Sequence, residues 1–291
     1  MQEKIHSLSI SIIIPVLNEE KRVKPCIERL LSYCKEKGWD FELIFVDDGS
    51  IDSTVSIVKS YTILEERVKI LNCPRRLGKG GSIVHAVLNE PLKDCVTFMD
   101  VDLSAEPSEL ARLLAYIDEY DIVVGSRVLR DGLRPVKRPW YRSFLSNSYS
   151  MLFRALFRIP IYDPQCGLKL FRREITANLF DNVKIMGFAF DTDLIVTASA
   201  QGLRMKEVPI NWTHGMFSKV SVIKEVRSMG LDIVSIWYRY HLSWLHNKES
   251  YPQKKGSFFG KILFTILSIN NSVRDRALTG SVRRLTIQRL N

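Results

Sequence analysis

The sequence of 291 residues has few cysteines and no pair of them in a metal-binding pattern. Its five cysteines are odd in number, widely spaced and nowhere arranged as C-x-x-C. A disulfide scaffold needs paired cysteines, and a cysteine-based zinc site needs closely spaced ones. The sequence therefore indicates neither class of protein, and we expect reduced thiols.

Long apolar runs are also missing. The longest, residues 258–269, covers about 12 residues and contains Lys261, whereas a transmembrane helix needs about 20. The apolar stretch at residues 8–16 has no small-residue cleavage site and leads directly into a loop, so we expect no secretory signal. If the protein meets a membrane, we expect it to lie on the surface.

Two common nucleotide-binding motifs are absent as well. No G-x-G-x-x-G follows the first apolar run, which argues against a dinucleotide-dependent dehydrogenase. The segment RRLGKGGS at 75–82 is not a Walker A motif, because Gly80 stands where Ser or Thr must follow Lys79. Its glycines and bases suit phosphate contact at the start of a helix, but a Gly-rich turn with solvated basic side chains explains them equally well.

The formal net charge of +10 is concentrated in two segments. Residues 127–173 carry eleven Lys and Arg against two Asp and Glu, and residues 251–291 carry eight against one. Such segments attract nucleic acid, anionic lipid or a phosphorylated substrate, and charge alone does not distinguish these partners.

Apolar runs alternate with amphipathic segments along the first half of the chain. The runs predict buried strands at residues 10–14, 41–46, 68–71, 95–99 and 122–124. Helical patterns separate them. This alternation predicts an α/β domain with a doubly wound, mostly parallel sheet and helices on both faces. Ligands of such domains bind at the carboxyl ends of the strands.

Acidic residues follow two of the predicted strands. Asp47 and Asp48 end the second, and Asp100 and Asp102 follow the fourth. Carboxylates are the ligands that Mg²⁺ and Mn²⁺ prefer, and these ions also bind the phosphates of nucleotides. The sequence therefore predicts a crevice in which Asp100 and Asp102 bind one divalent metal ion.

Taken together, the motifs resemble those of the GT-A glycosyltransferases of family 2, which have a Rossmann-like fold. The resemblance rests first on IIIPVLNEE (12–20), VDDGS (46–50), RLGKGG (76–81) and DVD (100–102). Three later segments, DPQCGLKLF (163–171), FAFDTD (188–193) and VPINWT (208–213), are similar to those of the dolichyl-phosphate β-glucosyltransferase branch, with the dolichol-phosphate mannose synthases as near cousins.

The resemblance implies two groups of site residues. The residues that bind the donor nucleotide and its Mg²⁺ or Mn²⁺ are Pro15, Glu19, Val46, Asp48, Lys79, Asp100, Val101 and Asp102. The residues expected at phosphates and at the acceptor are Arg127, Arg142, Lys219, Asp163 and Asp191. Asp163 and Asp191 orient the acceptor or act as base in this interpretation. A loop-capping role for Asp163 and a helix N-terminal role for Asp191 are the alternatives.

Three positions depart from the pattern of the mannose synthases. Leu17 replaces an aromatic residue, Ser104 stands where some relatives supply a further metal ligand, and the segment around His214 lacks an arginine. These differences argue against GDP-mannose as the donor and leave the rest of the chemistry in place.

The C-terminal part of the chain, residues 223–291, has a different residue pattern. A helix is predicted at residues 223–245 with Ile233, Trp237, Tyr240 and Trp244 along one side. This face suits a bilayer interface, with packing against the protein core as the alternative. We expect a GT-A domain at residues 1–222 and an extension of amphipathic helices and basic residues at 223–291.

The combined prediction is an inverting, metal-dependent transferase. It moves a hexose, most simply from UDP-glucose, to dolichyl or polyprenyl phosphate at the cytoplasmic face of a membrane, to which it binds peripherally. The rivals are a dolichol-phosphate mannose synthase and a family 2 enzyme that extends a glycan. We expect no nucleic-acid partner, because nucleic-acid binding would leave the acidic crevice unexplained.

Overall fold

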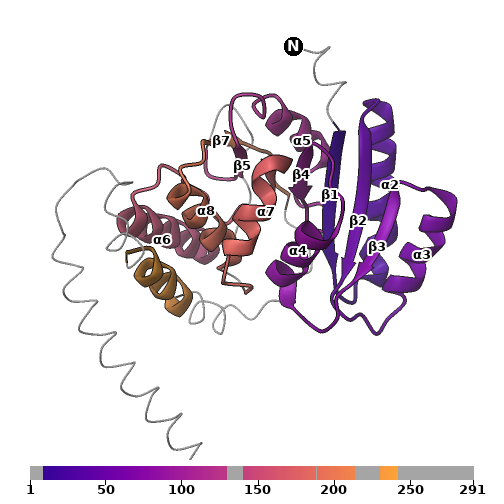
Figure 1. Ribbon diagram of the computed structural model, residues 1–291, viewed down its shortest axis with the longest axis horizontal. Coiled ribbons are helices and arrows are strands. Elements are labelled where there is room, and N and C mark those ends of the chain that lie inside the picture. Colours follow the sequence, from indigo (N-terminus) through magenta and orange to yellow (C-terminus); the bar gives the residue numbers. More distant parts are fainter. Residues whose placement is uncertain (1–8, 130–139, 188, 214–229, 242–291) are drawn as a thin grey trace, which may run out of the picture. The chain divides into compact units, whose positions relative to one another are not determined.

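The computed structural model describes residues 9–129, 140–187, 189–213 and 230–241, except for the side chains of 140–145. The chain divides into two compact units, Met1–Ser243 and Trp244–Asn291, and every described residue lies in the first. Figure 1 shows this unit as a sheet between two layers of helices.

The described residues form one seven-stranded sheet with the order β3-β2-β1-β4-β6-β5-β7. Its strands are β1 (Ser9–Val16), β2 (Asp40–Asp47), β3 (Val68–Asn72), β4 (Cys95–Phe98), β5 (Ile122–Ser126), β6 (Lys169–Arg172) and β7 (Met205–Pro209). Neighbouring strands are parallel except at β6, which runs antiparallel to β4 and β5. The prediction of a mostly parallel α/β sheet is confirmed.

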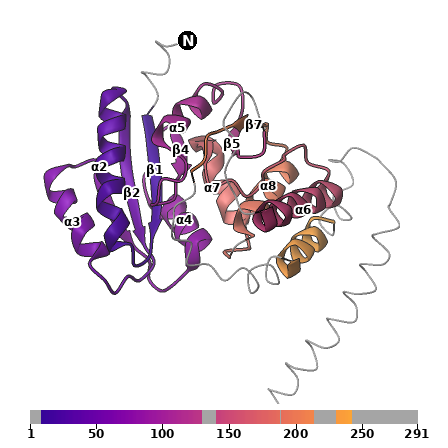
Figure 2. The ribbon, with the colours of Figure 1, turned by 180° about the vertical axis from the view of Figure 1, so that it is seen from behind.

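Helices cover both faces of the sheet, as the alternating pattern predicted. One face packs against α2 (Glu20–Glu36), α3 (Thr54–Leu64) and α5 (Pro107–Leu114). The other packs against α4 (Gly78–Asn89), α6 (Trp140–Phe157), α7 (Arg173–Asn182) and α8 (Phe190–Ala200). Figure 2 shows the same two layers from behind.

The isoleucines of β1 account for the two layers. Ile12 and Ile14 lie in the core beneath α2, whereas Ile13 lies in the core beneath α4. Successive side chains of a strand point to opposite faces. A run of consecutive isoleucines is therefore buried on both sides, and this central strand supplies apolar surface to both helical layers.

The register of the central strands determines where their loops emerge. Val16 of β1 pairs with Asp47 of β2, and Ile13 of β1 pairs with Phe98 of β4. Because these strands are parallel, the segments that follow them leave the sheet at the same edge. The acidic residues after β2 and β4 are thus brought to one edge together with the loop after β1.

A further helix covers residues 230–241. Ile233 and Ile236 are buried in the core that also contains residues of α6 and α8, and Trp237 and Tyr240 pack against the same core. The core-packing alternative is confirmed for Ile233 and Ile236, whereas Trp237 and Tyr240 stay partly exposed and their contact with a bilayer remains a prediction. Trp244 lies outside the described residues, and within them no helix is long and apolar enough to cross a membrane.

Asp193 of α8 anchors this helix to the domain. Its carboxylate is fully buried, accepts the backbone N–H groups of Lys184 (2.8 Å) and Ile185 (2.9 Å), and forms an ion pair with Arg239 of the 230–241 helix. A buried charge is tolerated only where hydrogen bonds and an opposite charge compensate its lost hydration. Asp193 therefore joins α8 to the loop that precedes it and to a helix about 46 residues later in the chain.

We expect Asp193→Asn to lower the free energy of unfolding by about 2–4 kcal/mol, because the variant loses the ion pair and weakens two buried hydrogen bonds. Chemical denaturation followed by circular dichroism measures this change. The matched control is Asp181→Asn, at an exposed position of α7, which should change stability by less than about 0.5 kcal/mol. Equal stability of Asp193→Asn and the wild type would contradict the anchoring role.

Candidate active site

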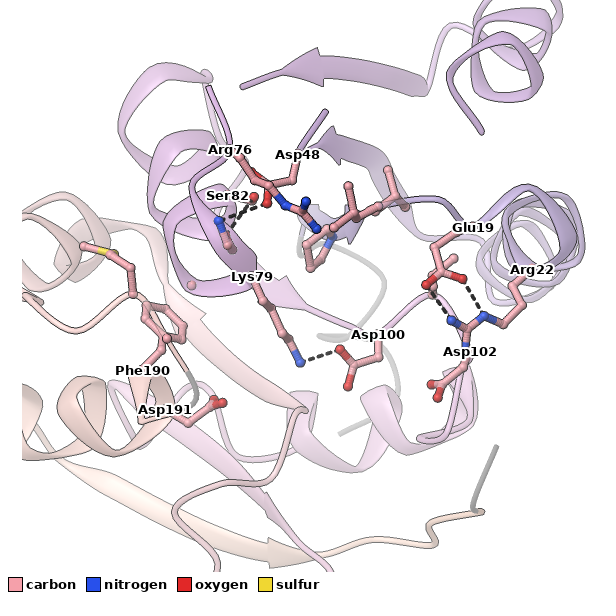
Figure 3. Close-up of a pocket in the computed structure, with 18 of the residues that line it drawn as sticks. Glu19, Arg22, Asp48, Arg76, Lys79, Ser82, Asp100, Asp102, Phe190 and Asp191 are labelled. Atoms are coloured by element: carbon pink, nitrogen blue, oxygen red, sulfur yellow. Dashed lines mark hydrogen bonds and ion pairs between the residues drawn. The ribbon is translucent and has the colours of Figure 1, made fainter. Parts of the chain in front are cut away.

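A cavity of about 790 Å³ opens at the carboxyl edge of the sheet. Figure 3 shows carboxylates and basic side chains from several elements converging on it. The predicted site residues that line it are Pro15, Glu19, Asp48, Lys79, Asp100, Val101, Asp102 and Asp191. The crevice expected from the strand ends therefore exists, and it gathers eight of the residues expected there.

The other predicted residues lie elsewhere. Val46 is fully buried within β2 and does not reach the cavity. Arg127 and Asp163 are absent from the lining and bind each other. Arg142 belongs to α6, but its side chain lies outside the described residues, and so does the whole of Lys219.

Asp48 connects the end of β2 to the start of α4. Its carboxylate is almost fully buried and accepts the backbone N–H groups of Leu77 (2.6 Å) and Gly78 (2.9 Å). Gly78 has φ +76°, a conformation that glycine adopts without strain. The Leu77 and Gly78 amides are thus already bound to a carboxylate. This contact fixes the start of α4, the helix that carries Lys79.

Gly80 has a packing role. A Cβ atom at this position would lie 2.6 Å from the Phe190 ring and 2.8 Å from the Met186 carbonyl oxygen. Only a glycine lets α4 approach the start of α8 so closely. The motif that resembles a phosphate loop therefore also builds the wall of the cavity.

Lys79 reaches into the centre of the acidic cluster. Its ammonium forms an ion pair with Asp100, which Figure 3 shows as a dashed line. Burial acts to lower the pKa of Lys79, but attraction to Asp100, Asp191 and Asp102 outweighs burial and leaves the pKa above its ordinary value. Lys79 is therefore a protonated group surrounded by carboxylates.

Asp102 differs from the other acidic residues that line the cavity. It is exposed, and Ser104 donates its backbone N–H to the Asp102 carboxylate at 3.0 Å. Among the described residues no Lys or Arg forms an ion pair with it. Nor do the described residues contain a cluster of three or more His, Cys, Asp or Glu side chains arranged for a metal ion.

Two basic residues of the lining, Arg22 and Arg76, were not among the individual site residues predicted from the sequence. Arg22, in the first turn of α2, pairs with Glu19 three residues earlier. Arg76 lines the cavity near Asp48 (Figure 3). The i,i+3 spacing of Glu19 and Arg22 was a usable signal, whereas the position of Arg76 depends on the turn before α4.

Arg127 and Asp163 form a buried bidentate ion pair beside the cavity. Both N–O distances are 2.7 Å, the Arg127 backbone N–H adds a third bond at 2.9 Å, and the guanidinium lies 5.2 Å from the centre of the Trp212 ring. Burial acts to lower the pKa of Arg127, but attraction to Asp163 outweighs burial and leaves the pKa above its ordinary value. The geometry supports a structural role for this pair.

Glu207 of β7, which the sequence analysis also missed, holds the same loop. Its carboxylate accepts the backbone N–H groups of Tyr162 and Asp163, both at 2.7 Å. Burial raises the pKa of Glu207 above its ordinary range, although these hydrogen bonds act in the opposite direction. Two contacts therefore fix this loop: Glu207 binds its backbone, and Arg127 binds the Asp163 side chain.

The comparisons with known proteins agree with this geometry. Residues 11–180 match the family described as Glycosyl transferase family 2. A dolichyl-phosphate beta-glucosyltransferase of Trichomonas vaginalis is 30% identical over 83% of this chain and 75% of its own length. That of Dictyostelium discoideum is 31% identical over 82% of this chain and 76% of its own length.

A solved structure shares the fold. Glucosyl-3-phosphoglycerate synthase from Mycobacterium tuberculosis, in complex with Mn²⁺, UDP and glucosyl-3-phosphoglycerate, superimposes with a TM-score of 0.61 at 17% identity, over 82% of this chain and 84% of that one. At this identity the match supports the fold alone. The family match over more than half the chain and the similarity to relatives of about 30% identity over about three quarters of their length show that this protein is a glycosyltransferase of family 2.

Proposed function

We propose that the protein transfers glucose from UDP-glucose to dolichyl phosphate or a related polyprenyl phosphate, with inversion at the anomeric carbon. The observation that carries this proposal is the similarity, at about 30% identity over about 80% of the chain, to enzymes named for that reaction. The cavity of carboxylates and basic groups at the carboxyl edge of the sheet suits a nucleotide sugar.

The reaction forms one bond and breaks another. A phosphate oxygen of the acceptor attacks the anomeric carbon of glucose, and the electron pair of the bond to UDP passes to the oxygen of the leaving diphosphate. The acceptor phosphate is already an anion, so no strong general base is needed. Positioning and charge neutralisation then account for most of the rate enhancement.

The chain's own residues supply both the positioning of the substrates and the neutralisation of charge. Glu19 and Asp48 bind the nucleoside end of the donor, where Pro15 shapes the wall. Lys79, held protonated among the carboxylates, stabilises the negative charge that develops on the diphosphate. Asp191, in the first turn of α8, lines the cavity, and in this proposal it orients the reacting groups.

A divalent cation fits this site. Asp100 and Asp102 present hard oxygen ligands to the cavity, and Asp102 is exposed and without a basic partner among the described side chains. Mg²⁺ and Mn²⁺ bind through one or two carboxylates together with the phosphates of a substrate, so two carboxylates are sufficient. When bound, the ion would neutralise charge on the departing diphosphate.

The acceptor places the reaction at a membrane, because its hydrocarbon stays in the bilayer while its phosphate enters the cavity. We propose peripheral attachment at the cytoplasmic face. The basic segment at 251–291 supports attraction to anionic lipid, which is worth about 1 kcal/mol per basic residue near the surface.

Removal of the metal should abolish transfer. We expect EDTA to stop turnover, added Mn²⁺ or Mg²⁺ to restore it, and Asp102→Asn to remove most activity while the circular dichroism spectrum stays unchanged, because the variant loses one anionic metal ligand. Glucose transfer from labelled UDP-glucose to lipid phosphate measures this. Full activity in EDTA would refute metal dependence.

Asp48→Ala should weaken donor binding by about 10- to 100-fold, the effect of a lost charge-assisted contact, with little change in acceptor affinity. Isothermal titration with UDP-glucose measures the first quantity, and acceptor KM the second. The control is Asp40→Ala at the opposite end of β2, where Asp40 binds Lys93 away from the cavity. If Asp48→Ala binds the donor as tightly as the control does, Asp48 has no part in the donor site.

The acceptor must carry a phosphate. We expect polyprenyl phosphate in vesicles to accept glucose and the corresponding free polyprenol to accept none, because the neutral alcohol is a poor nucleophile without a base. Chromatography of the lipid products distinguishes the two. Comparable rates with the alcohol would mean that the site deprotonates its acceptor and would overturn this mechanism.

A further inference from the structure

Lys169 of β6 is a lysine whose side chain is fully buried (0% exposed). Its ammonium donates to the Cys166 carbonyl oxygen at 2.6 Å and to the Asp191 carboxylate, and it lies 5.7 Å from the centre of the Phe98 ring. Burying an ammonium is costly unless hydrogen bonds and an opposite charge compensate it. The Cys166 carbonyl oxygen and the Asp191 carboxylate provide this compensation.

One partner, Asp191, lines the cavity, and the other, Cys166, is adjacent in sequence to Gln165, which also lines it. On the other side of Cys166, a Cβ atom at Gly167 would lie 2.9 Å from Asp100 Oδ2, so the backbone of this turn touches the Asp100 carboxylate. One buried ammonium therefore holds Asp191 and the turn that abuts Asp100.

Asp191 lies on the side of the cavity away from Asp48, and the Lys79 side chain lies between them (Figure 3). Lys169 does not line the cavity. It can influence transfer only through the groups that it holds, chiefly the Asp191 carboxylate.

We propose that Lys169 is a positioning residue for sugar transfer, which orients Asp191 at the reacting end of the cavity and leaves the nucleoside end unaffected. This inference rests on the proposed function. It predicts a specific kinetic pattern, because a misplaced reacting-end group lowers turnover, whereas donor binding through Glu19 and Asp48 persists.

The test is Lys169→Met in the full chain, assayed with UDP-glucose and polyprenyl phosphate. We expect kcat to fall about 100-fold, the usual effect of a small misplacement of reacting groups, with KM for UDP-glucose and the Kd of UDP within about 3-fold of wild type. Lys169→Arg, which keeps the charge, should recover part of kcat. An unchanged kcat in Lys169→Met, or an equal loss of donor affinity, overturns the proposal.

Lys69→Met is the matched control. Lys69 pairs with buried Glu42 at 2.7 Å, and neither residue lines the cavity. This variant should lose stability with kcat unchanged. An equal fall in kcat for the control would mean that any broken ion pair of the sheet impairs transfer, and would overturn a special role for Lys169.

A double variant keeps the test valid if Lys169→Met fails to fold. Lys169→Met/Asp191→Asn removes both charges of the pair, so it leaves no uncompensated charge buried. Its kcat should lie within about 3-fold of that of Asp191→Asn alone, because Lys169 acts through Asp191. A further large loss would show that Lys169 acts independently and would refute the proposal.

Crystal structures separate this inference from the proposed function. If the wild type transfers no glucose to any polyprenyl phosphate, the proposed function fails, but the position of Asp191 can still be compared between wild type and variant. We expect the Asp191 side chain and the 165–167 backbone to move in Lys169→Met relative to the wild type. If that variant does not fold, the 165–167 backbone should move in Lys169→Met/Asp191→Asn relative to Asp191→Asn alone. Unchanged positions would overturn the positioning role, whatever the substrate proves to be.

Discussion

The parallel pairing of β1 with β2 and β4 is the constraint on which the site depends. It aligns Val16 with Asp47 and Ile13 with Phe98, so that the segments following the three strands emerge together. Consecutive isoleucines bury β1 on both faces, which suits its place at the centre of the sheet with a hydrogen-bonded neighbour on each side. The cavity at this edge is a consequence of the pairing.

The second constraint on the site is that its carboxylates need compensating partners. Three carboxylates in or beside the cavity are bound by groups from other elements: Asp48 by amides at the start of α4, Asp163 by Arg127, and Asp191 by Lys169. These contacts fix the carboxylates before any substrate arrives. Preorganised charges need no rearrangement during the reaction, which is how electrostatic catalysis lowers a barrier.

The helix at 230–241 shows what an amphipathic pattern alone cannot decide. An apolar face with Trp237 and Tyr240 has the same sequence signature whether it meets a bilayer or a protein core. The decisive contacts are tertiary: the core shared with α6 and α8 buries Ile233 and Ile236, and Asp193 binds Arg239. Neither partner can be identified from the helix's own sequence.

The sequence by itself determined the alternation of strands and helices, the two helical layers, and the placement of Asp48, Asp100 and Asp102 after buried strands. Local periodicity and the direction of parallel strands suffice for these features. Only the tertiary structure decided that Arg127 binds Asp163 rather than lining the cavity, that Gly80 admits Phe190, and that buried Lys169 holds Asp191. Such pairings join residues from different elements, and their geometry depends on how those elements pack together, which no local pattern encodes.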